Sequence, residues 1–395
     1  MATAFPKNWC LPPPRYIDGF KEIFNEKTFP LFIHWCYVNT ILQYAPTLST
    51  EIYEISQQAM NKVIGIKEMP SIEKQAARLI SSIYDQPIGI YYGRKYFGEE
   101  AKKDITAIVK EIIETYGQRI RNNNILSEET KEKAILKLSR IHIKMGYPDQ
   151  YDPFFDTLTV SDDDSFFDAM NKINRIKKKH LFEKLTKPTN PEEWLMPGHM
   201  VNACYDPFRN DITFPAAILQ KPFYSVGQKR EENLGGIGTV IGHEISHAFD
   251  NNGSHFDENG NLFDWWKKDD FETFEKKTKD MTVQFDGIPY HGGKVNGGLV
   301  VSENIADNGG MAVTLEIMHT LKNPDFEAYF LNWARIWCMK AKKGFTKILL
   351  TMDVHSPSEV RANMQPRNFS EWYETFSVQP SDKMFIPEDK RIIIW

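Results

Sequence analysis

Cysteine is scarce in this sequence, with four residues in 395. The four are far apart, show no CxxC pair and follow no regular spacing: Cys10, Cys36, Cys204 and Cys338. A secreted protein of this length usually carries more cysteine, so a reducing compartment is favoured. We interpret the four residues as isolated small hydrophobic side chains.

Long hydrophobic runs are missing as well. The opening stretch "MATAFPKNWCLPPPRYIDGF" lacks the basic region followed by an apolar region that a secretory signal requires. The most apolar early run, Phe29–Tyr44, contains a histidine and is shorter than the roughly 20 residues of a membrane span. We predict a buried helix there. We therefore expect a cytoplasmic protein without a membrane span, with release to the cell surface or outside the cell without a signal peptide as the alternative.

An excess of charge of one sign is also absent. The net charge is −5, and both signs are spread along the chain, which excludes the basic footprint of a nucleic-acid-binding protein. The basic run Arg175–His180 is interpreted as the polar face of a helix. The G-x-S-x-G signature of a serine nucleophile does not occur. The length allows two or three domains, and no internal repeat is visible.

The first half of the chain has helical patterns and the second half begins with strands. Apolar residues at three-to-four spacing predict a helix over Glu99–Arg121, and Ser127 is a plausible N-cap for the next helix. That helix ends before "GYPDQYDP", and a third runs from about Phe166 to Leu185. Beyond a connector at 186–194, the "DPFRND" turn predicts a β-hairpin with arms near 201–205 and 212–214.

The stretch "GTVIGHEISHAFD" carries two histidines four residues apart in an apolar run. On a helix, His243 and His247 would point the same way and could share one zinc ion. Glu244 would lie about 100° round the helix, where it can reach a water without being a ligand. The alternative is a buried helix whose histidines bond to backbone or carboxylate neighbours.

A third ligand favours the zinc site. The metzincin pattern requires a glycine at position 250 and a histidine at 253, but this chain has Asp250 and Gly253. "VSENIADNGG" instead supplies Glu303, which would complete a His₂Glu site with a fourth position left for water. Asp307, one turn further on, could orient His243, and Asp250, expected on the same helix, could orient His247. Without a metal, both aspartates could equally be helix caps or solvated charges.

Four motifs in order, "VNACYDPFRNDITFPAAILQKPFY", "GGIGTVIGHEISHAFDNNG", "SENIADNGG" and "DVHSPSEVR", resemble the neprilysin/endothelin-converting-enzyme family of zinc metallopeptidases, most closely its bacterial cytoplasmic-type members. The resemblance runs from about residue 45 to the C-terminus. Family members are much longer, and the equivalent of much of the lobe that roofs their active site has no match here. The opening stretch to Tyr16 has no counterpart that we can place.

The resemblance implies roles for further residues. Asn202 and Ala203 match the strand edge that binds the substrate backbone. His355 matches the histidine that stabilises the oxyanion, and Arg361 the arginine that binds a substrate carbonyl and braces the site. The positions that line the apolar pocket for the residue after the scissile bond are matched by Ile218, Phe223, Val240 and Trp337. From the residues alone, these four would be core positions.

The resemblance implies a mostly α fold with a small β-sheet, an α+β thermolysin-like zinc catalytic domain preceded by a helical segment. We predict three parts: an N-terminal segment at 1–44, a helical part of the N-terminal lobe at 45–190 and the catalytic domain at 191–395.

The predicted protein is a monomeric metalloendopeptidase with one Zn²⁺. It would cleave short oligopeptides on the amino side of hydrophobic residues, with Glu244 as general base for a metal-activated water. The alternative is a zinc-binding fragment with weak or no activity that acts as a protein- or peptide-binding module, because the roofing lobe is missing.

Overall fold

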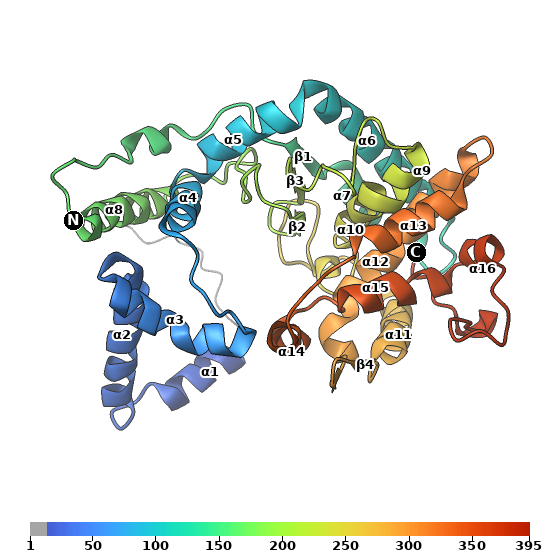
Figure 1. The fold of residues 1–395 in the computed structure, drawn as a ribbon. Helices are drawn as coiled ribbons and strands as arrows, with labels where there is room; N and C mark the ends of the chain where they lie inside the picture. Colours follow the sequence, from blue (N-terminus) through green and yellow to red (C-terminus); the bar gives the residue numbers. More distant parts are fainter. Residues whose placement is uncertain (1–13) are drawn as a thin grey trace. The chain divides into compact units, whose positions relative to one another are not determined.

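We describe the fold from a computed structural model, which covers residues 14–395 (Figure 1). Cys10 and the stretch before residue 14 lie outside the described residues. The chain forms two compact units. One consists of the described part of Met1–Ile72 together with Asp152–Asn190, and the other of Glu73–Tyr151 together with Pro191–Trp395. One junction between the units, at Asn190, falls at a predicted domain boundary. Residues 73–151, however, belong to the same unit as 191–395. The three-part division stays a prediction.

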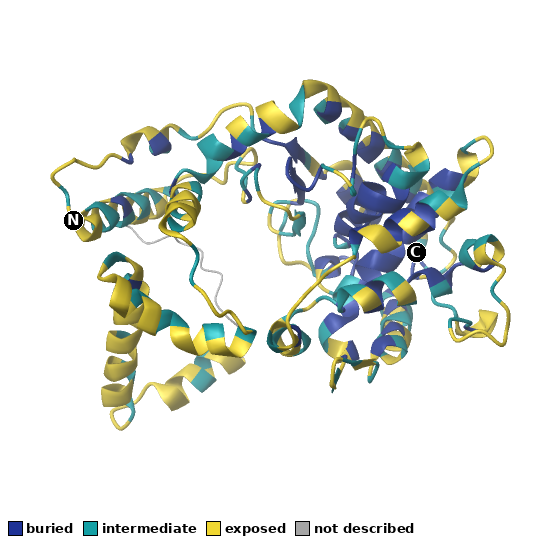
Figure 2. Cartoon of the chain, in the orientation of Figure 1, coloured by how far each residue is buried: buried dark blue, intermediate teal, exposed yellow. Residues whose placement is uncertain are grey.

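The first unit is helical, with α1 (Pro14–Ile23), α2 (Phe29–Tyr44), α3 (Thr50–Ile64) and α8 (Phe166–Lys184). Helix α2 has the predicted bounds, but the prediction that it is buried is wrong, because none of its residues is buried (Figure 2). Trp35 and Tyr37 are more than half exposed. An apolar helix needs neighbours on all sides to be buried, and the few other helices of this unit do not surround it.

The second unit contains most of the elements. Its first part holds α4 (Ile72–Ile83, which begins at the junction), α5 (Asp85–Tyr96), α6 (Gly98–Asn122), α7 (Glu128–Ser139) and β1 (His142–Gly146). Its second part begins with β2 (Cys204–Asp206), β3 (Asp211–Pro215), α9 (Arg230–Asn233) and α10 (Thr239–Ser246). It continues with α11 (Lys268–Phe285), β4 (Pro289–Tyr290), β5 (Gly293–Lys294) and α12 (Gly297–Thr320). The last helices are α13 (Phe326–Ile336), α14 (Lys343–Met352), α15 (Ser358–Met364) and α16 (Ser370–Phe376).

The main sheet has three strands in the order β1-β3-β2. β3 pairs parallel with β1 and antiparallel with β2, with Tyr205 opposite Ile212. β2 is therefore an edge strand, and Asn202 and Ala203 directly precede it. The predicted hairpin is confirmed. β1 was not predicted, because its residues fall at the end of the predicted second helix and in the "GYPDQYDP" stretch that follows. No helix in residues 14–395 is both long and apolar enough to cross a membrane.

The predicted helices of the first half are confirmed. α6 spans the predicted range, and Ser127 caps α7 by accepting a hydrogen bond from the backbone N–H of Thr130. α8 begins at Phe166 as predicted, and Ser165 is its N-cap. These elements were predictable because apolar spacing and capping are local properties of a segment.

The core of the second unit is built around α10 and α12, which contain mostly buried residues (Figure 2). The two helices approach closely because each has a glycine at the crossing. A Cβ on Gly242 would lie 2.7 Å from the Cα of Gly310, and a Cβ on Gly310 would lie 2.3 Å from the carbonyl oxygen of Thr239. This close approach brings the metal-ligand candidates of the two helices together.

We predict that Gly310→Ala destabilises the protein by about 1–3 kcal/mol, because the new methyl group would push α10 and α12 apart. The unfolding midpoint, measured by circular dichroism on metal-free protein, tests this. The matched control is Gly298→Ala in the first turn of α12, where a Cβ would meet only Asn296 Oδ1 at 3.5 Å. The control should leave stability unchanged or raise it by about 0.5–1 kcal/mol. Equal midpoints for the two variants would contradict the close-packing argument.

Candidate metal centre and active site

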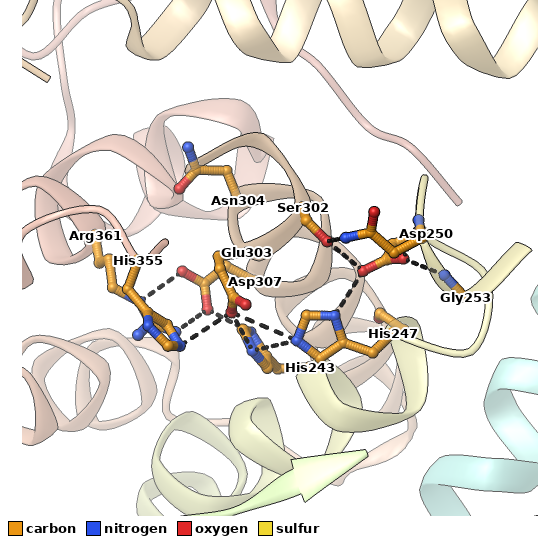
Figure 3. Close-up of polar contacts among 12 residues, drawn as sticks. His243, His247, Asp250, Gly253, Ser302, Glu303, Asn304, Asp307, His355 and Arg361 are labelled. Carbon is orange, nitrogen blue, oxygen red and sulfur yellow. Dashed lines mark hydrogen bonds and ion pairs between the residues drawn. The ribbon is translucent and has the colours of Figure 1, made fainter. Parts of the chain in front are cut away.

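Three predicted ligands converge at the crossing of α10 and α12 (Figure 3). His243 lies on α10, His247 is the C-cap residue of that helix, and Glu303 lies on α12. The Nε2 atoms of the two histidines are 3.0 Å apart. Oε2 of Glu303 is 3.1 Å from Nε2 of His243 and 3.4 Å from Nε2 of His247.

The other ring nitrogen of each histidine is bound to a carboxylate. Nδ1 of His243 is 2.8 Å from Oδ1 of Asp307, and Nδ1 of His247 is 2.6 Å from Oδ2 of Asp250. A carboxylate only accepts hydrogen bonds, so Nδ1 carries the proton in each neutral ring and Nε2 presents a lone pair. Both lone pairs then face each other and the Glu303 carboxylate.

Three acceptors that face one another in a buried site require a cation or added protons. Zinc binds nitrogen and oxygen at about 2.0–2.2 Å in tetrahedral geometry, which places neighbouring ligand atoms about 3.3 Å apart. The separations of 3.0–3.4 Å at this site match that geometry. The donor set of two imidazoles and one carboxylate therefore fits a zinc ion.

The charges of the site follow from its burial and hydrogen bonds. Burial lowers the pKa of His243 and His247, but the hydrogen bonds to Asp307, Asp250 and Glu303 outweigh it and raise the pKa of both rings above 6.5. Burial raises the pKa of Glu303, but the surrounding histidines lower it well below its ordinary value. Without a metal, the histidines therefore tend to hold protons and Glu303 stays ionised.

A second set of three ligand atoms is available, because His243, Glu303 and His355 each offer an atom within 4.8 Å of the others. We propose His247 rather than His355 as the third ligand. His247 is fixed by buried Asp250, whereas the side chain of His355 is 42% exposed and lies in the loop between α14 and α15. His355 Nε2 is 3.1 Å from Glu303 Oε2, so this ring points at the carboxylate of the proposed ligand (Figure 3).

We predicted that Asp250 lies on the same helix as His247. This placement is wrong, because Asp250 lies in the turn after α10. The helix ends at Ser246, and the chain turns back at Asp250. Oδ1 of Asp250 accepts hydrogen bonds from the backbone N–H groups of Asn252 and Gly253, both at 2.7 Å. The turn thus fixes Oδ1 of this carboxylate, while Oδ2 is bound by His247 and Ser302.

Asp307 joins His243 to Arg361. Nε and Nη2 of Arg361 donate to the two oxygens of Asp307 at 2.8 and 2.6 Å, and the guanidinium lies 3.7 Å from the centre of the Trp337 ring. Burial raises the pKa of Asp307, but Arg361 and His243 lower it to about 2. The bracing role expected of Arg361 is thus visible in its contacts, whereas its binding of a substrate carbonyl stays a prediction.

Glu244 and the predicted pocket residues border one cleft of about 480 Å³ next to the centre. Glu244 is buried on α10, and its charge contributes to the raised pKa of Cys204, which burial mainly causes. The predicted substrate-binding residues that line the cleft are Asn202, Ala203, Ile218, Phe223, Val240 and Trp337. The cleft also contains the three proposed ligands, Asp250, His355 and Arg361; Asp307 is not in its wall but behind His243.

Several residues that support the site were not predicted from the sequence. Ser302 donates to Oδ2 of Asp250 at 2.5 Å and accepts from Asn252. Asp353 accepts from the backbone N–H of His355 and lies 2.8 Å from its Nδ1. Both residues stand inside quoted motifs, Ser302 directly before Glu303 and Asp353 two positions before His355, so adjacency to a ligand or catalytic candidate was the available signal.

Comparisons with known proteins give one consistent result. Two family models, both described as Peptidase family M13, match residues 202–392 and 2–148. The likeness thus begins near residue 2, which corrects our estimate of residue 45. Neutral endopeptidase of Lactococcus lactis is 44% identical over 96% of this chain and 61% of its own length.

Solved structures agree with the sequence comparison. PepO from Lactobacillus rhamnosis matches with a TM-score of 0.91 and 42% identity, over 96% of this chain and 60% of that one. The zinc metalloprotease Zmp1 of Mycobacterium tuberculosis, solved with an inhibitor, matches with a TM-score of 0.86 and 29% identity over the same shares. The chain therefore spans about 60% of the length of these proteins.

We predict that zinc binding releases protons, and more of them at pH 6.5 than at pH 8.5. The raised pKa values of His243 and His247 mean that protons compete with the metal near neutral pH, so the apparent affinity falls as the pH falls. Calorimetric titration in buffers of different ionisation enthalpy measures the release. His247→Ala should reduce it, whereas His319→Ala, at an exposed pair with Glu371, should not. Heats independent of the buffer at pH 6.5 would contradict the assignment.

Proposed function

Because the chain belongs to peptidase family M13, we propose that it is a zinc-dependent endopeptidase that hydrolyses peptide bonds in short oligopeptides. The observation that carries the proposal is the convergence of His243, His247 and Glu303 beside Glu244 in one cleft. The chain spans about 60% of the length of these relatives, and we propose this activity for the chain itself. A cytoplasmic, monomeric protein remains part of the proposal, in keeping with free Cys36, Cys204 and Cys338.

Zinc held by His243, His247 and Glu303 would supply the Lewis acidity that makes a water nucleophilic and polarises the scissile carbonyl. Glu244 is next to the first ligand, faces the cleft and carries a carboxylate that can take the proton of the attacking water. The same carboxylate then delivers that proton to the leaving amine. One C–O bond forms and the C–N bond breaks, without a covalent bond to the protein.

Charge that develops on the carbonyl oxygen needs a donor on the other side of the cleft. Burial lowers the pKa of His355, but the hydrogen bonds to Glu303 and Asp353 outweigh it and raise the pKa above 6.5. Its Nδ1 is held by Asp353, which leaves Nε2 directed at the centre. An oriented donor of this kind contributes about 3 kcal/mol to the stability of an oxyanion.

The cleft also accounts for how a peptide could be held. Asn202 and Ala203 precede the edge strand β2, where backbone groups can pair with an extended peptide whatever its sequence. Apolar side chains border the same cleft and can take the residue after the scissile bond: Ile218, Phe223, Val240 and Trp337. We therefore propose cleavage on the amino side of hydrophobic residues.

Glu244→Gln should lower kcat for a fluorogenic peptide by about 10²–10⁴-fold, because the amide cannot accept the proton, while zinc binding stays intact. Glu275→Gln, at an exposed position of α11, is the matched control and should leave both unchanged. A zinc-loaded chain that cleaves no peptide would favour the peptide-binding module instead. A Glu244→Gln variant as active as the parent would contradict the assignment of Glu244 as general base.

Val240→Phe should narrow the apolar pocket and reverse the enzyme's preference for a large substrate residue after the scissile bond. We expect kcat/KM for peptides with phenylalanine after the scissile bond to fall about tenfold or more relative to peptides with alanine there. Cleavage sites and rates are measured by mass spectrometry on a matched peptide series. Val226→Phe, at a residue that is 52% exposed, controls for the substitution itself. An unchanged ratio would place the specificity pocket elsewhere.

A further inference from the structure

Lys137 is a buried lysine that the proposed mechanism does not use. It lies on α7, and its side chain is almost fully buried, with a relative exposure of 1%. Its Nζ donates to three backbone carbonyl oxygens, those of Ala248, Gly253 and Phe256, each at 2.7 Å. An ammonium group has three N–H donors, so the three acceptors match the charged form of the side chain.

The surroundings of this ammonium are aromatic and acidic. The rings of Tyr205, Phe249 and Trp265 have their centres 5.8–5.9 Å from Nζ. Burial lowers the pKa of Lys137 to about 7, against the charges of Asp250, Asp257 and Glu258, which raise it. The three carbonyls and the nearby carboxylates therefore offset part of the cost of burying this charge.

The three carbonyls belong to the segment that turns back after the proposed zinc helix. Ala248 directly follows His247, and Gly253 donates its N–H to Asp250. The turn is tight, because a Cβ on Gly253 would lie 1.8 Å from the carbonyl oxygen of His247. A single cation thus holds both ends of the turn that places the Asp250 carboxylate on the His247 ring.

Lys137 also connects this turn to the strand edge of the cleft. The side chain of Asn210 donates to the carbonyl oxygen of Lys137 at 3.0 Å and accepts from the hydroxyl of Tyr205 on β2. Tyr205, Asn252 and Gly253 all border the cleft. Lys137 on α7 therefore contacts both the turn, through its Nζ, and the hairpin, through its carbonyl oxygen.

We propose that Lys137 is a positioning residue of the metal centre, which acts through the turn at 248–256 and Asp250 to orient His247. The assignment rests on the proposed zinc site. A lysine that only stabilised the fold would affect unfolding but not the metal affinity of the folded protein. Groups that orient a metal-bound histidine typically change metal affinity by 10–100-fold.

The chain offers a matched control in Lys144. This lysine is also buried, and its Nζ donates to the carbonyl oxygen of Glu193 and to Asp211, away from the metal helix. Lys137→Met and Lys144→Met both remove a buried ammonium together with its hydrogen bonds. Both should lower the unfolding midpoint. Only Lys137→Met should weaken zinc binding, by about 10–100-fold, measured by competition with a chromophoric chelator.

A double variant tests the route through Asp250. If Lys137 acts by placing Asp250, then Lys137→Met combined with Asp250→Ala should weaken zinc binding by about as much as Asp250→Ala alone. Zinc affinity of Lys137→Met equal to that of the parent, equal losses for Lys137→Met and Lys144→Met, or fully multiplicative losses in the double variant would each overturn the proposal.

If Lys137→Met fails to fold, Lys137→Gln takes its place in the same measurements, because its amide keeps two N–H donors. Absence of zinc binding by the parent chain would overturn the proposed function and this assignment together. A parent chain that binds zinc, with Lys137 variants that bind it equally well, would overturn the assignment of Lys137 alone. The two failures are therefore distinguishable.

Discussion

The metal centre of the second unit depends on three hydrogen-bond acceptors that face one another in a buried site. Two imidazole lone pairs and a carboxylate face one another at 3.0–3.4 Å where α10 crosses α12. Such an arrangement is repulsive unless a cation lies between the groups or the imidazoles take up protons. The close crossing at Gly242 and Gly310 makes the convergence possible, and the hydrogen bonds of Asp250 and Asp307 prevent the rings from turning away.

The charges around this meeting point balance when a divalent ion is included. Glu244, Asp250, Glu303 and Asp307 are buried or nearly buried carboxylates, and the cations that oppose them in the same region are Arg361 and Lys137. Two positive charges cannot neutralise four negative ones, and uncompensated charge is costly in a buried site. With Lys137 charged, a Zn²⁺ ion would bring the formal sum of these six groups to zero, and protons on His243 and His247 would do the same in its absence. The metal and these protons therefore compete for one electrostatic role.

Local signals were sufficient for much of the fold and of the centre. The spacing of His243 and His247, the one-turn spacing of Glu303 and Asp307, and the apolar periodicity of α6 are properties of short segments, and short-range geometry determines them. Non-local contacts were not predictable in this way. β1 exists because it pairs with β3, which follows it by more than sixty positions in sequence, and α2 is exposed because its unit does not surround it. Asp250 was assigned to the right histidine, but the helix end at Ser246 was not recognised, because the residues that follow continue the apolar pattern.

The geometry of the centre depends on more than the C-terminal residues. The segment 191–395 contains every proposed ligand and catalytic residue, yet helices from 73–151 hold the proposed zinc helix in place. The hydroxyl of Tyr116 on α6 donates to Ser246 at 3.1 Å, and Lys137 on α7 holds the turn beyond it. Arg119 on α6 pairs with Glu316 on α12 at 2.5 Å. Residues from the two segments thus share one core, and the geometry on which metal binding depends is fixed by contacts that span more than one hundred positions of sequence.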